Sequence, residues 1–379
     1  MAETKPLAGL VVVEFANVLA GPLVGQFCAE LGARVIKVEP PVSGDPTRGW
    51  YLENESRDTD VTAYFASANW GKESIALDLA DQEDRETARR LALAADVLVV
   101  GYKPGDERKF GLDHATLSAA NPGLVYLQIT AYGRDDPRPG FDAIIQAEAG
   151  FTYMNGAPDG GPVKMPVALM DLLAAHQLKE GLLLALLKKA RTGDGSFVAT
   201  SLLRSATASL ANQASNYLMA GVVPGRMGSE HPNIVPYGSI FITRDGREFV
   251  VAVGTERQFL AFVAALGLDE LAQDPRYSSN GERVRNRSAL NARIGERVAA
   301  LLATEIEAAM TARKVPFGFV NDMAAVFEQP AARAQCFTGG AGVRTVALEG
   351  DMEGLSALTP PPQLDADRAA VLAWLDSAS

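Results

Sequence analysis

The segment from residue 10 to residue 39 constrains the fold more than any other part of the sequence. An apolar run, Leu10–Phe15, leads into a turn and a short helical pattern that ends at Gly32, and a second apolar run follows at Arg34–Glu39. A strand, a helix and a strand in this order predict a parallel sheet with helices on its faces. The turn contains Gly21 and Gly25 but no GxGxxG pattern, so we expect no nicotinamide or flavin cofactor.

Further apolar runs alternate with helical patterns as far as residue 220, and the order of elements then changes. The runs expected as strands are 74–79, 97–100, 124–129 and 196–200, and helices are expected near 82–94 and 203–219. A loop rich in glycine and proline, Gly221–Asn233, marks a domain boundary. After it, runs at 239–243 and 248–253 flank a tight turn and predict a hairpin, with helices at 256–265 and 282–303.

These patterns predict an α/β protein of 379 residues with two domains, because single cores rarely grow to that length. Residues 1–220 are expected to form a large Rossmann-like domain with a parallel sheet, and residues 221–330 a small α+β domain. Residues 331–379 form a tail with possible strand material near 342–348 and a last helix near 366–375. This tail is too short to fold alone, so we expect it to dock on the large domain.

One long helical pattern, from Asp171 to about Arg191, is apolar on nearly every face. A helix of this kind is expected to be buried. Lys188, Lys189 and Arg191 suit the negative end of the helix dipole, and Gly193 suits the position just after the helix. Asp171 itself is expected to cap the start of the helix, where the free amides would keep its carboxylate ionised. The same position suits a nucleophile that accepts an acyl group.

Composition excludes several classes of protein. The net charge of -11 argues against a nucleic-acid partner. Apolar runs are too short for a membrane span, and the first residues lack the pattern of a signal peptide, so we expect a cytoplasmic protein. Cys28 and Cys336 are interpreted as ordinary thiols, and three scattered histidines suggest no metal site.

Several separated motifs resemble those of the family III CoA-transferases, which include formyl-CoA:oxalate CoA-transferase and, as a divergent branch, alpha-methylacyl-CoA racemase. The resemblance covers nearly the whole chain, in order. The matching stretches are Val18–Pro22, Leu31–Glu39, Gly44–Trp50, Asn69–Asp78, Lys103–Gly105, Arg191–Gly195 and Pro236–Tyr237.

The resemblance implies that Asp171 is the catalytic nucleophile. In such enzymes the aspartate attacks a donor acyl-CoA and forms a mixed anhydride, and the released CoA thiolate then converts the anhydride into an aspartyl-CoA thioester. An acceptor carboxylate attacks in turn, and a second anhydride yields the new acyl-CoA. Coenzyme A is therefore expected as a substrate, with no permanently bound cofactor. Each anhydride has to be shielded from water.

The resemblance also implies binding residues. CoA-binding positions correspond to Lys37, Tyr102, Lys109 and Tyr132, and substrate-binding positions to Leu19, Arg48, Trp50 and Tyr64. A cation such as Arg48 or Arg226 would hold the far carboxylate of a dicarboxylic acid. The glycine-rich lid of the oxalate enzyme would fall at residues 221–228, where this sequence has no run of glycines.

Three functions follow from the resemblance as alternatives. A CoA-transferase would move CoA from a donor, such as succinyl-CoA, to a small carboxylic or dicarboxylic acid. A racemase or epimerase needs a histidine directly before Asp142, where this chain has Phe141, which carries no proton. A non-catalytic CoA-binding protein would not need Asp171. The resemblance further implies an interlocked homodimer.

Overall fold

The computed structural model describes residues 5–337, 341–350 and 357–378, and the chain divides into two compact units. The first unit comprises residues 1–151, 164–222 and 331–379, and the second comprises residues 152–163 and 223–330. The chain therefore leaves the first unit twice and returns to it twice. Helices α7 (Phe151–Met154) and α16 (Pro330–Ala334) each contain a boundary between the units.

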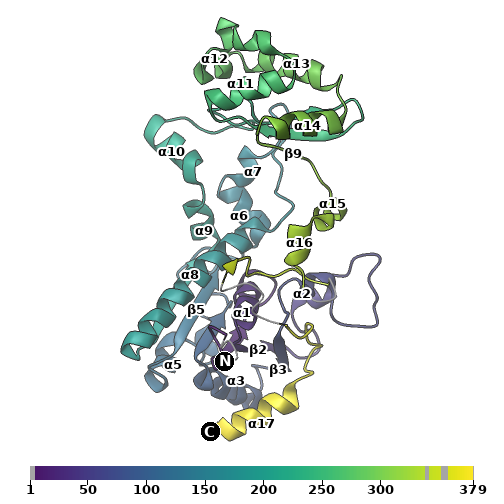
Figure 1. Ribbon diagram of the computed structural model, residues 1–379. Helices are drawn as coiled ribbons and strands as arrows, with labels where there is room; N and C mark the ends of the chain where they lie inside the picture. Colours follow the sequence, from purple (N-terminus) through teal and green to yellow (C-terminus); the bar gives the residue numbers. More distant parts are fainter. Residues whose placement is uncertain (1–4, 338–340, 351–356, 379) are drawn as a thin grey trace. The chain divides into compact units, whose positions relative to one another are not determined.

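A six-stranded parallel sheet forms the centre of the first unit, as the strand-helix-strand segment predicts (Figure 1). Its order is β3-β2-β1-β4-β5-β6, so the sheet grows outward in both directions from β1 and β4. The strands are β1 (Val11–Phe15), β2 (Arg34–Glu39), β3 (Lys72–Ala76), β4 (Val97–Val100), β5 (Val125–Thr130) and β6 (Ser196–Ser201).

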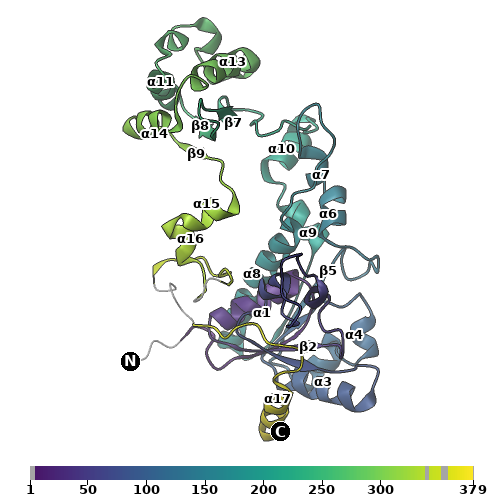
Figure 2. The ribbon, with the colours of Figure 1, turned by 90° about the vertical axis from the view of Figure 1, so that its right-hand side faces the viewer.

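Helices cover both faces of this sheet, and Figure 2 shows α1 and α8 on one side of it and α3 and α17 on the other. The helices of the unit are α1 (Ala20–Glu30), α2 (Ala63–Ala66), α3 (Gln82–Ala94), α4 (Asp106–Lys109), α5 (His114–Ala120), α6 (Asp142–Glu148), α8 (Leu169–Thr192), α9 (Leu202–Ala208), α10 (Ala211–Ala220) and α17 (Arg368–Ala378). Alternate strand residues therefore fill two separate apolar cores, one under each helical layer.

Helix α8 ends as predicted, but it is not buried all round. Gly193 has a φ of 79° and its amide bonds to the carbonyl of Lys189, which closes the helix. One stripe of residues, including Ala174, Leu178 and Leu182, packs on the sheet. The opposite face is exposed, and Leu184 retains 69% of its accessible surface. The prediction of a fully buried helix is therefore wrong for the single chain.

The tail contacts the edge of the sheet beside β3. The amide of Ser74 donates to Asp367 at 2.9 Å, and the amide of Ala76 donates to Asp365 at 2.8 Å. Residues 342–348 form no strand, since only an isolated bridge joins Cys336 to Val343. The predicted helix 203–219 is broken into α9 and α10 at Ala211, which has a φ of 47°.

The second unit contains a three-stranded antiparallel sheet, β7-β8-β9, packed against helices. The predicted hairpin is confirmed by β7 and β8. The predicted helix 282–303 is two helices, α12 and α13, and neither β9 nor α14 was predicted. The elements are β7 (Tyr237–Ile242), β8 (Glu248–Ala252), β9 (Phe317–Phe319), α11 (Glu256–Ala265), α12 (Asn280–Arg285), α13 (Arg287–Val298), α14 (Ala303–Ala312) and α15 (Met323–Glu328).

Candidate active site

Asp171 lies in the first turn of α8, but it does not cap the helix. The helix begins two residues earlier, and Ala168 occupies the cap position without a side-chain bond. The amide of Met170 donates instead to Oδ1 of Asp142, at 2.8 Å. The prediction that Asp171 is the cap is wrong, because a different carboxylate satisfies the helix amide.

Asp142 is fixed in this place by Gln146, one turn further along α6. Its Oδ2 accepts a hydrogen bond from Nε2 of Gln146 at 2.6 Å. The Oε1 atom of the same glutamine accepts the amide of Met165 at 2.8 Å. Asp142 and Gln146 together therefore hold the segment that leads into α8 and set the position of Asp171.

The electrostatics of Asp171 differ from the expectation for a capping carboxylate. Burial, followed by the negative charge of Asp142, raises the pKa of Asp171 from 3.8 to about 7. Within the part of the chain that the structure describes, no hydrogen bond or salt bridge to its carboxylate offsets this. The expectation that free amides keep Asp171 ionised is therefore wrong. With a pKa of about 7, both the protonated and the ionised form of the side chain are populated near neutral pH.

One predicted substrate residue, Tyr64, lies near Asp171, and a second, Trp50, contacts Tyr64. Burial and the charge of Asp171 raise the pKa of Tyr64, which places the phenol within electrostatic reach of that carboxylate. The ring of Trp50 meets that of Tyr64 edge to face, with centroids 4.9 Å apart, and Trp50 is 45% exposed. Leu19 is buried in the core formed by α1 and α8. Trp50 and Tyr64 thus form an aromatic wall open to solvent on one side.

Lys37, predicted to bind CoA, does not offer its ammonium to a ligand. Its side chain is 0% exposed, and its Nζ lies 3.0 Å from carboxylates of both Glu14 and Asp45. The carbonyl of Ala16 accepts its third hydrogen bond at 2.7 Å. An ammonium has three protons, so Lys37 is saturated inside the protein.

Arg48 is also occupied, which removes it as the partner of a substrate carboxylate. Its guanidinium forms a two-point ion pair with Glu39, at 2.8 and 2.7 Å, and contacts Asp60 at 3.2 Å. The same group lies over the ring of Phe65 and donates to the carbonyl of Pro362. The buried group therefore links the sheet edge to the tail.

Tyr102 lines a hollow of about 330 Å³ at the carboxyl ends of β1, β2, β3 and β4. This is the edge and the switch point at which open α/β sheets bind ligands. Its walls also include Phe15, Asn17, Leu79 and Phe110. Phe15 and Phe110 each contact the ring of Tyr102, so the hollow has an aromatic floor suited to a flat ring.

Lys109 lies in a groove that shares Phe110 with this hollow. It contacts Asp106 and is largely exposed. Three arginines, Arg85, Arg89 and Arg108, line the same groove. Four cations and one carboxylate, Glu86, line this groove, so it is locally positive on a chain of net charge -11.

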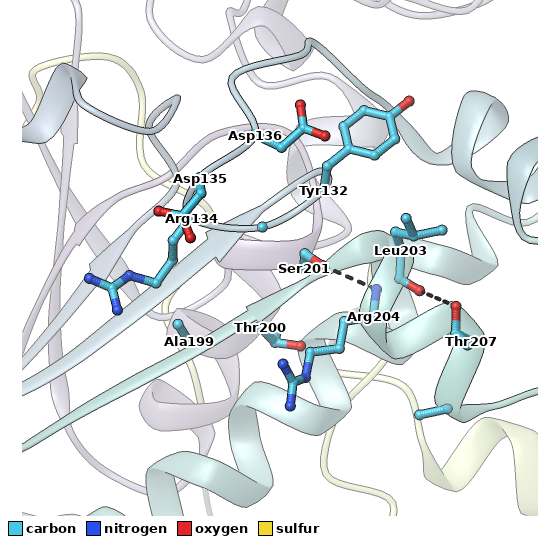
Figure 3. A pocket seen from close by; sticks show the side chains of 12 residues that line it. Tyr132, Arg134, Asp135, Asp136, Ala199, Thr200, Ser201, Leu203, Arg204 and Thr207 are labelled. Atoms are coloured by element: carbon cyan, nitrogen blue, oxygen red, sulfur yellow. Dashed lines mark hydrogen bonds between the residues drawn. The ribbon is translucent and has the colours of Figure 1, made fainter.

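Tyr132 lines a different hollow, of about 820 Å³, at the carboxyl ends of β5 and β6. Figure 3 shows it with Asp136 on the loop after β5, across from Arg204 and Thr207 on α9. Its hydroxyl donates to Glu148 at 3.2 Å, and Arg138 lies over its ring. The structure therefore does not bring Tyr132 to the hollow that Tyr102 lines.

Comparison with known proteins identifies the class of enzyme. The family model described as CoA-transferase family III matches residues 7–369. The chain belongs to this family. It is a CoA-transferase, and the enzymes it resembles are named for the exchange of CoA between acids.

Relatives of this CoA-transferase include proteins with named substrates. It is 36% identical to the succinate–glutarate CoA-transferase of Agrobacterium fabrum, over 98% of this chain and 96% of the relative. It is 35% identical to human succinyl-CoA:glutarate CoA-transferase, over 87% and 75% of the two chains. The crystal structure of a CaiB/BaiF family protein from Brucella suis is similar, with a TM-score of 0.86 and 39% identity over 98% of this chain and 100% of that one.

Three residues of the candidate site, Asp142, Asp45 and Asn17, were not predicted from the sequence. Asp142 was named only to locate Phe141, the position at which a racemase has a histidine, and no role was predicted for Asp45 or Asn17. Asp45 lies inside the motif Gly44–Trp50, which was the signal that could have found it. No group of histidine, cysteine and acidic residues fit for a metal ion occurs among the described residues. In the same residues, no helix has the length and apolar character that a membrane crossing requires.

Proposed function

We propose that this enzyme transfers CoA from succinyl-CoA to a small dicarboxylic acid, with Asp171 as the nucleophile. The observation that supports this most is the state of Asp171: half-buried, without a cation, and with a pKa near 7 beside an aromatic wall. Perturbed carboxylates of this kind are typical of catalytic sites. The relatives named for succinate and glutarate support the choice of acids.

Desolvation and Asp142 give the reaction a driving force. When Asp171 attacks the thioester carbonyl, its oxygen becomes part of a neutral anhydride and its negative charge passes to the departing thiolate. The repulsion from Asp142 and the cost of burial are then relieved. A pKa raised from 3.8 to about 7 corresponds to about 4 kcal/mol at most. The thiolate then attacks the Asp171 carbonyl, releases the donor acid and forms the aspartyl-CoA thioester.

The hollow lined by Tyr102 and the adjacent groove support a binding mode for CoA. The adenine ring would stack in the hollow, and its phosphates would meet Lys109 and the arginines of the groove. The hollow includes Phe15 and Asn17, from which the chain leads into α1, and α1 shares a core with Tyr64. The pantetheine arm would cross the sheet edge there and bring the thioester to Asp171.

We propose Lys164 as the cation for the far carboxylate of a dicarboxylic acid, since Arg48 is occupied. Its ammonium is exposed, and within the described residues it donates only to the carbonyl of Met165, at 2.7 Å. Met165 is in turn bonded to Gln146, which holds Asp142. Lys164→Ala is expected to raise the KM for glutarate about tenfold and to leave a monocarboxylic acceptor unaffected, as loss of one charge-assisted bond implies.

The exposed apolar surface of the first unit supports a homodimer. Leu184 on α8 is 69% exposed, and Met219 on α10 is 88% exposed. Surface of this kind on a soluble enzyme marks an interface. Leu184→Glu is expected to shift the protein from dimer to monomer in sedimentation equilibrium. A parent protein that is itself a monomer would contradict the proposed dimer.

The function is tested with a panel of CoA esters and isotopically labelled acids, read by mass spectrometry. Succinyl-CoA with labelled glutarate is expected to give labelled glutaryl-CoA. If no acid exchanges with any thioester while deuterium enters at the carbon next to the carbonyl, the enzyme is a racemase and the proposal fails. If neither reaction occurs, the proposed substrates are wrong.

A further inference from the structure

The loop between β1 and α1 contains a strained residue. We call Ala16, Asn17 and Val18 the β1–α1 turn. Val18 has a φ of 70°, in the left-handed region that residues branched at Cβ avoid. Strain of this kind persists only where the surrounding structure holds it, and it gathers at functional sites.

A buried ion pair holds both sides of this turn. The amide of Val18 donates to the two carboxylate oxygens of Asp45, at 3.0 and 3.2 Å. The carbonyl of Ala16 accepts a hydrogen bond from Nζ of Lys37 at 2.7 Å. Lys37 and Asp45 lie 3.0 Å apart, and both side chains are fully buried. The pair thus fixes the backbone on each side of Asn17.

The ion pair is itself held in one position. Asp45 also accepts the amide and hydroxyl of Thr47, at 3.0 and 2.8 Å, and Lys37 donates to Glu14 at 3.0 Å. Burial raises the pKa of Asp45, but Lys37 and Thr47 outweigh it and the pKa is lowered. There is also no spare room against the turn, since a Cβ added to Gly21 would lie 2.4 Å from that of Ala16.

The turn lies between the two parts of the proposed site. Asn17 lines the hollow that contains Tyr102. Val18 packs on the core that also holds Tyr64 and residues of the first turn of α8. A displacement of the turn would therefore change the path between the nucleotide hollow and Asp171.

We propose that Lys37 and Asp45 are a positioning pair, which keeps the β1–α1 turn in its strained conformation so that a thioester bound across it reaches Asp171. The inference rests on the proposed function. Neither residue touches the substrate. Their contribution is to the geometry of the attack, where a displacement of about 1 Å reduces a rate about 100-fold.

The test compares Asp45→Ala with the parent enzyme in three measurements. The rate of Asp171 acylation by succinyl-CoA, followed by hydroxylamine trapping, is expected to fall about 100-fold. The affinity for adenosine 3′,5′-bisphosphate is expected to stay within about twofold, because the walls of the hollow at Tyr102 and Phe110 are unchanged. In a crystal structure of the variant, the φ of Val18 is expected to become negative.

A second substitution distinguishes positioning from general damage. Glycine adopts a positive φ without strain, so Val18→Gly in the Asp45→Ala background is expected to recover about tenfold of the lost acylation rate. The matched control is Glu256→Gln, which breaks the ion pair with buried Arg283 in the second unit. Its acylation rate is expected to equal that of the parent.

Four results would overturn the positioning role: normal acylation by Asp45→Ala, loss of nucleotide affinity in proportion to the rate, no recovery with Val18→Gly, or an equal loss in Glu256→Gln. Failure of the proposed function has a different signature, namely no trapped adduct in the parent enzyme. In that case the conformation of Val18 in the Asp45→Ala structure decides, and a φ that stays positive overturns the inference.

Discussion

Two groups of carboxylates at the same sheet edge behave in opposite ways. Glu39 and Asp45 are buried, but Arg48 and Lys37 lie within hydrogen-bonding distance of them, and their pKa values are lowered although burial raises them. Burial and then the charge of a second carboxylate, Asp142, raise the pKa of Asp171, because no cation in the described ranges lowers it as Lys37 and Arg48 lower the other two. Burial alone therefore does not set the sign of the shift. The two carboxylates paired with cations hold backbone amides, whereas Asp171 has no cation partner among the described residues.

The largest effect is expected where the unpaired carboxylate is replaced. Asp171→Asn removes the proposed nucleophile but keeps the size and shape of the side chain, so CoA exchange should fall at least ~10⁴-fold. The measurement is transfer of CoA from succinyl-CoA to labelled glutarate. Asp135→Asn, at the rim of the separate hollow near Tyr132, serves as the control and should keep normal activity. Substantial exchange by Asp171→Asn would remove the distinction between the two groups.

A buried pair is expected to affect stability rather than chemistry. Lys72 donates to Glu14, to Asn69 and to the carbonyl of Pro22, and all four groups lie within the first unit. Lys72→Met should lower the free energy of unfolding by ~3 kcal/mol, because a buried charge loses a partner.

Urea unfolding followed by tryptophan fluorescence measures this effect, since Trp50, Trp70 and Trp374 all belong to the first unit. Arg89→Met, which breaks an exposed pair with Glu86 in the same unit, is the control and should cost less than ~1 kcal/mol. Equal losses in the two variants would show that burial does not distinguish these pairs.

The unpaired carboxylate should destabilise the fold at high pH. The pKa of Asp171 is about 7 in the native state and 3.8 in the unfolded chain, so protonation of this carboxyl stabilises the native state. The stabilisation is fully present below pH 3.8 and is lost as the pH rises through about 7. Asp171→Asn carries no such charge, so it should be more stable than the parent by ~2 kcal/mol at pH 8. The same fluorescence measurement tests this, and a less stable variant at pH 8 would contradict the raised pKa.

The smallest effect is expected for the neighbour that shifts Asp171. Asp142→Asn still accepts the amide of Met170 but removes the facing charge, so the pKa of Asp171 should fall by ~1 unit. The pH profile of adduct formation measures the change. Glu148→Gln, on the same helix but bonded to Tyr132, should leave the profile unchanged, and a shift in both variants would remove the specific role of Asp142.

Local patterns predicted much of the fold. The parallel sheet follows from alternating runs, and both β4 and α11 begin and end at the predicted residues. β9 was missed because three residues carry too little periodicity. The break at Ala211 depends on a positive φ that composition does not indicate.

The candidate site was predictable only in part, because its electrostatics depend on distant partners. Lys37 and Arg48 were predicted from the family resemblance to bind ligands, but Glu14, Asp45, Glu39 and Asp60 form ion pairs with them. The amide of Met170 meets Asp142, 28 positions earlier in the sequence. Such pairings are set by tertiary structure, so sequence spacing does not show them.

The most direct test of the account is to locate and titrate the covalent intermediate. The enzyme is incubated with succinyl-CoA and hydroxylamine from about pH 5 to about pH 9, and its peptides are mapped by mass spectrometry. A hydroxamate is expected on Asp171, and its yield should increase with pH around a midpoint of about 7. A hydroxamate on another residue, or a yield on Asp171 that is constant over this range, would contradict this expectation.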